Sequence, residues 1–222
     1  MLLLFVFFAI SAERGLALRP VQTLPSARLS SQLFGGGILR GDHLPSLISM
    51  ASESQRGLLR SRNAEIIELI EAIASDQKKY MSKVEKIAAK KAALDGKWEA
   101  IWTTEKETLF FCSSGLFGKP VSRVLQVIDT AGSSINNIIE FEDNRAFSVI
   151  GSINLDQSTS DCPDGTCRVE FAFKSAELRI PPFPSLTLPP VGKGWFDNLY
   201  VNEKYRLSRD IRGDYLISKR IS

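Results

Sequence analysis

Leu94-Asp95-Gly96-Lys97-Trp98 opens the part of the chain that decides the fold, and Tyr205-Arg206-Leu207-Ser208-Arg209 starts its last predicted hairpin. A Gly-x-Trp on the first strand and an arginine on the last hairpin are typical of a small antiparallel barrel. The tryptophan ring closes one end of such a barrel, and the arginine covers the ring. We therefore expect Gly96, with either Arg206 or Arg209, to close the barrel over this tryptophan. The interior should be apolar and open at one mouth.

From Leu94 to its end the chain alternates apolar and polar residues with the period of a β-strand. About eight short strands separated by turn residues favour a closed barrel or a strongly curled sheet. The fold is therefore predicted to be mainly β, with an antiparallel barrel preceded by an N-terminal helical segment. The clearest predicted strands are residues 123–128, 135–141, 147–153 and 168–174, and the arms of the final hairpin are 205–209 and 215–219.

Five of the ten residues from Pro181 to Pro190 are proline, which excludes a central strand there. The residues are compatible with three positions of this loop: at the rim of a ligand mouth, in contact with lipid, or folded back over the helices as a lid. Apolar side chains lie in or beside the loop: Ile180, Phe183, Leu186, Leu188 and Val191.

Residues 42–93 are predicted to form a helical segment that packs on a barrel domain of residues 94–222. Pro45 suits the first turn of one helix. Asn63 is the predicted cap of a second helix, whose apolar residues recur at helical spacing. A lysine-rich amphipathic pattern follows from about Asp76. Its apolar face is thin and lacks Trp and Phe, which favours a solvated helix face over a helix lying on an anionic membrane.

Residues 1–41 are predicted to be a targeting segment outside the fold. Residues 1–17 are signal-like because they contain the unbroken apolar run Leu2–Ile10. Residues 18–41 are transit-like because they carry arginine and serine but no acidic residue. Plastids enclosed in extra membranes need such a two-step address. Plain secretion followed by a disordered spacer is the alternative.

The excess of positive charge lies in this targeting segment. The whole chain has 28 Lys and Arg against 25 Asp and Glu, and residues 1–41 contain four of the former and one of the latter. The remainder therefore has equal numbers of basic and acidic residues. A neutral remainder gives no support to nucleic-acid binding, so no nucleic acid is expected among the partners.

The sequence lacks the residues of common catalytic and metal sites. Its single histidine, His43, allows no triad of the Ser-His-Asp or Cys-His type and no zinc site built on several histidines. No glycine motif for binding phosphate occurs. No catalytic residue, metal ligand or cofactor is therefore predicted. Cys112, Cys162 and Cys167 are too few for a disulfide scaffold. Cys162 and Cys167 flank a turn and form either a reversible disulfide or two loop thiols.

Aromatic side chains give the positive signal for a binding function. Those in or beside the predicted strands, Phe110 and Phe111 among them, are either core residues or walls of a ligand cavity. In an eight-stranded barrel the same interior side chains serve both purposes. The candidate lining residues are Trp98, Trp102, Phe147, Phe171, Phe173 and Trp195.

Several short motifs keep a fixed order and spacing between about Leu44 and Arg220. They are Arg56-Gly57, Leu94 to Trp98, Trp102 to Glu107 (Trp-Thr-Thr-Glu-Lys-Glu), Gly115 to Gly118 (Gly-Leu-Phe-Gly), Gln126 to Asp129, Gly194 to Phe196, and Arg206 to Leu216. In these motifs the chain resembles the plastid lipid-associated protein (fibrillin) family. It departs from that family in its longer and more basic stretch before Leu94, so its surface contacts are expected to differ.

The resemblance implies a lipocalin-like barrel in plastids, at plastoglobules or thylakoids, that binds or stores isoprenoids, carotenoids or other lipids without enzymatic activity. It implies a hydrophobic small molecule or lipid as ligand and peripheral contact with plastid membranes or lipid droplets, and it leaves room for protein partners. The family offers no catalytic residue to transfer. Two other functions stay open: a scaffold that docks enzymes of plastid lipid or quinone synthesis, and an enzyme acting on an apolar substrate.

Overall fold

The computed structural model describes residues 43–77, 93–155, 167–189 and 192–222 of the chain. The predicted targeting segment, most of the lysine-rich pattern and Cys162 lie outside the described residues. The predictions made for them are not tested by the structure.

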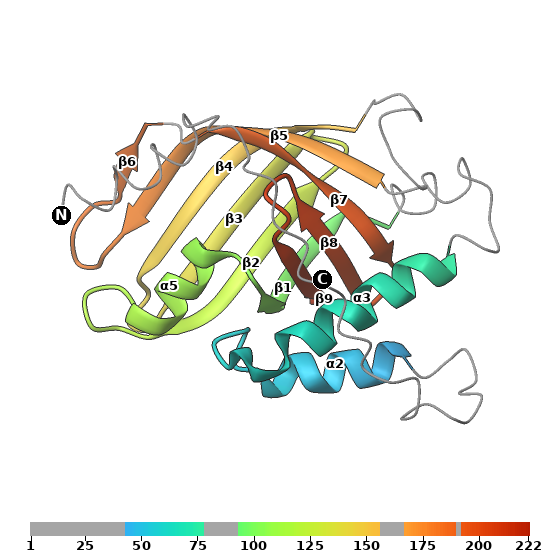
Figure 1. Ribbon diagram of the computed structural model, residues 1–222. Coiled ribbons are helices and arrows are strands. Elements are labelled where there is room, and N and C mark those ends of the chain that lie inside the picture. Colours follow the sequence, from blue (N-terminus) through green and yellow to red (C-terminus); the bar gives the residue numbers. More distant parts are fainter. Residues whose placement is uncertain (1–42, 78–92, 156–166, 190–191) are drawn as a thin grey trace, which may run out of the picture.

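Eight antiparallel strands form a closed barrel (Figure 1), which confirms the predicted fold class. Around the barrel the strands follow the order β4-β3-β2-β1-β9-β8-β7-β5, and pairing of β4 with β5 closes the circle. Closure gives each of these strands a hydrogen-bonded neighbour on both sides. Their bounds are β1 Gly96–Thr103, β2 Val121–Asp129, β3 Ser134–Phe141, β4 Ala146–Asn154, β5 Cys167–Arg179, β7 Lys193–Val201, β8 Tyr205–Asp210 and β9 Tyr215–Arg220.

Two helices cover one side of the barrel from outside (Figure 1). They are α2 (His43–Glu53) and α3 (Asn63–Gln77), and the short 3-10 helix η1 (Arg60–Arg62) leads into α3. Their apolar faces form one buried cluster with outward-facing side chains of the barrel, including Trp102 and Ile217. Apolar residues at helical spacing produce these faces. Among the described residues, no helix has the length and apolar character needed to cross a membrane.

Asn63 does not cap α3, contrary to the prediction. It is the first residue of the helix, and its side-chain Oδ1 is buried without a hydrogen-bond partner among the described residues. Its backbone N–H donates to the carbonyl of Arg60. The 3-10 helix therefore runs directly into α3 and takes the place of a side-chain cap.

A further helix, α5 (Lys106–Ser114), follows β1 and lies across one end of the barrel (Figure 1). Phe110 and Phe111 were expected in or beside strands, whereas the structure places both in this helix. Phe111 is buried, and its ring lies 5.8 Å from that of Phe147 and 6.0 Å from that of Phe141. These tertiary contacts hold the helix against the barrel.

The proline-rich segment contributes a short additional strand, β6 (Leu186–Leu188), beside Ala176–Leu178 of β5. No central strand is formed by its described residues, as the prolines predicted. Figure 1 shows β6 at the opposite side of the barrel from α2 and α3, so this strand is not a lid over the helices. Phe183 and Leu186 are 71% and 55% exposed.

Candidate functional site

The closed end of the barrel is built around Trp98, whose side chain is fully buried. Its indole Nε1 donates a hydrogen bond of 2.8 Å to the carbonyl of Leu94. The guanidinium carbon of Arg206 lies 5.3 Å from the centre of the Trp98 ring, and that of Arg220 lies 4.2 Å from it. Both are cation–π contacts. Gly96 has a φ of +128°, and a β-carbon there would collide with the Arg220 side chain.

Arg209 does not contribute to this closure. Alternation along β8 directs its side chain outward, where Nη1 lies 3.3 Å from the Glu71 carboxylate of α3. Arg220, which sequence reasoning missed, takes part instead because β9 places it directly opposite Trp98. The register of β1 with β9 sets the position of Arg220 opposite Trp98, and this register depends on how the two ends of the barrel domain pair.

A cavity of about 480 Å³ occupies the barrel interior. Its volume is in the range of small-molecule sites, roughly 300–1,000 Å³. Four of the candidate residues line it: Trp98, Phe147, Phe171 and Phe173. The further apolar wall comes from several strands and from α5, and includes Ala100, Phe111, Val124, Ile135, Val149, Phe196 and Leu216.

Trp102 lies outside the cavity, unlike the expectation that it lines the barrel. In a regular strand it would share the inner face with Trp98 and Ala100. The pairing of β1 with β9 shifts between Ala100 and Trp102, and this β-bulge turns Trp102 outward. Its ring is fully buried against α2 and α3.

Trp195 also lies outside the cavity. Its neighbour Phe196 lines the interior, so alternation along β7 places Trp195 on the outer face. There the guanidinium carbon of Arg168 lies 3.6 Å from the centre of the Trp195 ring. The tryptophan therefore stabilises the barrel wall from outside.

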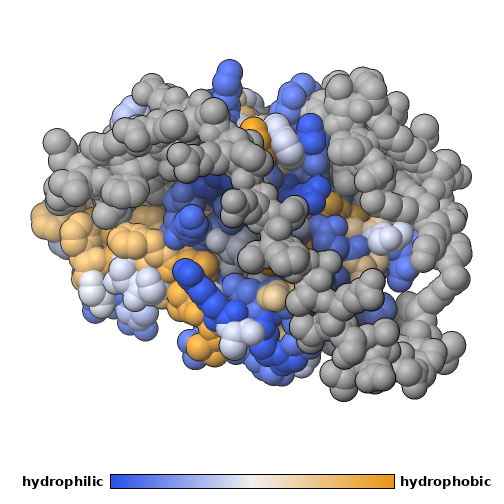
Figure 2. Space-filling view, viewed as in Figure 1, coloured by the Kyte–Doolittle hydropathy of each residue, from blue (hydrophilic) through white to orange (hydrophobic). Residues whose placement is uncertain are grey.

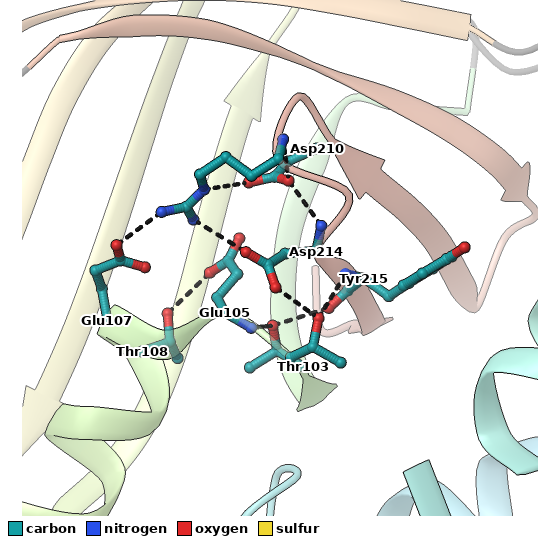
Figure 3. A network of polar contacts seen from close by, with 9 residues as sticks. Thr103, Glu105, Glu107, Thr108, Asp210, Asp214 and Tyr215 are labelled. Carbon is teal, nitrogen blue, oxygen red and sulfur yellow. Dashed lines mark hydrogen bonds and ion pairs between the residues drawn. The ribbon is translucent and has the colours of Figure 1, made fainter. Parts of the chain in front are cut away.

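Polar side chains gather where the cavity approaches α5 and the turn between β8 and β9; we call this end the mouth. Arg212 is central: its Nη1 lies 2.7 Å from Glu107, its Nε 3.0 Å from Asp210, and its Nη2 3.6 Å from Asp214. Figure 3 shows these carboxylates converging from the helix and the turn. This mouth network consists of Thr103, Thr104, Glu105, Glu107, Thr108, Asp210, Arg212, Asp214 and Tyr215.

Hydroxyl groups of the network fix the two segments to each other. Thr104 Oγ1 donates to Asp214 at 2.9 Å and accepts from the Tyr215 N–H at 2.9 Å. Thr103 Oγ1 donates to the Tyr215 carbonyl at 2.9 Å and accepts from the Glu105 N–H at 3.0 Å. The mouth is therefore a fixed polar border around an apolar interior.

A family model described as PAP_fibrillin matches residues 43–219, which include the helices, the barrel and the mouth network. The chain belongs to the PAP_fibrillin family. A protein of Arabidopsis thaliana, "Probable plastid-lipid-associated protein 11, chloroplastic", is 35% identical to it over 198 residues, covering 87% of this chain and 85% of that protein. No solved structure matches the chain significantly. The family resemblance inferred from the motifs is thus confirmed.

Glu105 is an acid with a strongly raised pKa in this PAP_fibrillin barrel. Its side chain lines the cavity and accepts a hydrogen bond of 2.9 Å from Thr108 Oγ1. Burial raises the pKa of Glu105 to about 7, and the nearby charges of Asp210 and Asp214 raise it further, while Thr108 and Arg212 act in the opposite direction. The cavity therefore holds a carboxyl group that is close to half-protonated at neutral pH.

Replacing Glu105 by Gln is expected to remove a pH dependence of stability. The folded pKa lies above the unfolded value, so the native state of the wild type binds more protons between about pH 5 and about pH 7 and loses stability as pH rises through that window. At pH 8 the free energy of unfolding of E105Q should exceed that of wild type by about 2 kcal/mol. This figure takes about 1.4 kcal/mol for each pKa unit and subtracts an allowance for partial exposure of the side chain. Urea unfolding at pH 5 and pH 8 measures this, with the exposed Glu142→Gln as control. Parallel pH profiles of wild type and E105Q would contradict it.

The mouth network was not among the predicted site residues of the PAP_fibrillin chain. Its acidic residues lie in two stretches that were both quoted as family motifs. Glu105 and Glu107 belong to Trp102 to Glu107, and Asp210 and Asp214 belong to Arg206 to Leu216. Their proximity follows from the pairing of β1 with β9, which no local pattern in the sequence encodes.

The acidic residues at the mouth do not form a metal site. Among the described residues, no group of three or more His, Cys, Asp or Glu side chains is placed to hold a metal ion. Arg212 already supplies the positive charge between Glu107, Asp210 and Asp214. The cavity offers apolar contact along its walls, with charged and hydrogen-bonding groups at the mouth.

Proposed function

We propose that the protein is a non-enzymatic plastid lipid-associated protein that binds or stores small hydrophobic molecules, such as isoprenoids, carotenoids or other lipids, inside its barrel. The observation that carries this proposal is the cavity of about 480 Å³ in a closed barrel, walled by aromatic and aliphatic side chains. Apolar area removed from water supplies the driving force, at roughly 25 cal/mol per Å².

The proposed place is the plastid, at plastoglobules or thylakoids. The relative in Arabidopsis thaliana is named as chloroplastic and plastid-lipid-associated, and the chain shares its family. The transit-like composition of residues 18–41 is in agreement with this location.

Exposed apolar side chains near the mouth support a peripheral contact with lipid. They belong to α5 and the loop after it, to the proline-rich segment, and to the turn between β8 and β9. Figure 2 shows apolar surface at the end of the molecule where β6 lies. Ligand would pass between the lipid phase and the cavity at this rim, whose exposed apolar residues are Phe110, Phe117, Phe183, Leu186 and Ile211.

Lipid retention by the purified full chain tests the proposal. The chain is mixed with a chloroplast lipid extract and with lipid droplets, repurified, and its lipid content is measured by mass spectrometry. We expect one apolar lipid per chain and co-flotation with the droplets. A protein that carries no lipid and ignores the droplets would contradict the proposal. A stoichiometric protein partner together with an empty barrel would favour the scaffold instead.

A further inference from the structure

Arg206 is a buried cation of the barrel interior. Its side chain is fully buried, and none of the ion pairs between described residues includes it. Its Nη2 donates to Gln126 Oε1 and, at 3.5 Å, to Ser218 Oγ. Its Nε and Nη1 have no hydrogen-bond partner among the described residues. An arginine has five N–H donors, and leaving some of them unsatisfied in an apolar interior costs free energy.

The closed end of the cavity, which we call the floor, is formed by residues that cover this guanidinium group; Arg206 lies directly behind them and does not itself line the cavity. Its guanidinium carbon is 5.3 Å from the Trp98 ring centre and 5.4 Å from that of Phe196, and both rings line the cavity. Gln126 and Ser218, which accept its hydrogen bonds, line the cavity as well. In the sheet Arg206 pairs directly with Ser218, so the two side chains leave their strands toward the same inner face.

Glu105 faces the same interior from the mouth. Burial lowers the pKa of Arg206 to about 9, and the charge of Glu105 partly reverses this effect. No hydrogen bond or ion pair joins these two side chains within the described part of the chain. The floor therefore keeps a positive charge whose stabilisation is incomplete, while the acid at the mouth is only about half ionised at pH 7.

We propose that the cavity binds a lipid carboxylic acid, whose carboxylate displaces the Gln126 side chain and accepts hydrogen bonds from Arg206 behind the floor, and whose chain follows the aromatic wall toward the mouth. The proposal rests on the proposed function, because it names the class of ligand taken by the same cavity. Charge-assisted hydrogen bonds between a guanidinium and a carboxylate are about twice as strong as neutral ones. An ester or an alcohol of the same chain length offers an acceptor oxygen but no charge, and leaves the cation uncompensated.

Three probes that share one chain and differ in the head group test this inference: oleic acid, methyl oleate and oleyl alcohol. Each is titrated calorimetrically into the purified full chain at pH 7, below the concentration at which it aggregates. We expect oleic acid to bind at least about tenfold more tightly than the other two, the factor that corresponds to one charge-assisted hydrogen bond.

Variants of Arg206 then assign the preference to this residue. R206M should weaken oleic acid binding at least about tenfold and leave methyl oleate within about threefold of wild type, because only the charged contact is lost. R206K, which keeps a cation, should retain part of the preference. R209M, which removes an arginine on the outer face of the same strand, should retain all of it. Thermal unfolding without ligand checks that each variant is folded. If R206M does not fold, the comparison of wild type with R206K decides the question.

Equal affinities of the three probes for wild type, or an unchanged preference for the acid in a folded R206M, would overturn this inference while lipid binding itself stands. If none of the three probes binds while the chain retains another apolar lipid from the chloroplast extract, this inference fails and the proposed function stands; if it retains no lipid either, both fail. A preference for the acid that also disappears in R209M would indicate attraction by the outer surface and would likewise overturn the assignment to the floor.

Discussion

Replacing Arg168 by Met is expected to lower the free energy of unfolding by about 3–5 kcal/mol, the cost of removing one partner of a buried ion pair. Asp197 is 1% exposed, and its two carboxylate oxygens accept hydrogen bonds of 2.8 Å from Arg168 Nε and 2.9 Å from Arg168 Nη2. The same guanidinium lies against the ring of Trp195. Without Arg168, the carboxylate of Asp197 remains in the barrel wall without this cation. Unfolding by guanidinium chloride measures the loss.

Arg209→Met is the matched control for this substitution. Arg209 also pairs with an acid across elements, but its side chain is 37% exposed and that of Glu71 is 45% exposed. An exposed pair contributes about 0–1 kcal/mol, so R209M should lose far less stability than R168M. Equal small losses in the two variants would show that Asp197 does not depend on Arg168.

Narrowing the cavity from two sides is expected to weaken the binding of an apolar ligand such as oleyl alcohol at least about tenfold, or roughly 1.4 kcal/mol. Val149 on β4 and Leu216 on β9 line the cavity and belong to strands that are not neighbours in the barrel. The double substitution Val149→Trp with Leu216→Trp places two large rings in the space that the ligand would occupy. Overpacking costs about 1–3 kcal/mol in a filled core, and less where the added atoms enter a cavity.

The same two strands provide the control for the narrowed barrel. Ile150 on β4 is 40% exposed, and Lys219 on β9 is also exposed. Ile150→Trp with Lys219→Trp therefore adds the same two side chains to the outside of the barrel, and affinity should stay within about threefold of wild type. An equal loss in both double variants, or no loss in the inner one, would mean that the ligand does not occupy the cavity.

Local patterns in the sequence predict the barrel and its closed end well. Apolar alternation marked the strands, and Gly96 with Trp98 marked the closure. The physical reason is that each strand of a small barrel has one face toward the interior, so its sequence carries the period of two. Asp210 to Gly213, a run of turn residues, likewise marked the final hairpin.

Features that depend on pairing between distant segments were not predicted. A single bulge after Ala100 moved Trp102 from the interior to the helix interface, and a register shift of this kind leaves no clear sign in composition. Phe111 of α5 packs on Phe141 and Phe147, which lie far from it in the sequence. The polar mouth likewise exists only once β1 and β9 are side by side.

The most direct test of ligand binding inside the barrel is an experimental structure of the full chain, purified after exposure to chloroplast lipids. We expect density for one elongated molecule between the Trp98 floor and the mouth, in contact with Phe171 and Phe173, and none for the narrowed Val149→Trp, Leu216→Trp variant. An interior filled by the protein's own side chains, with lipid only on the outer surface, would contradict the account.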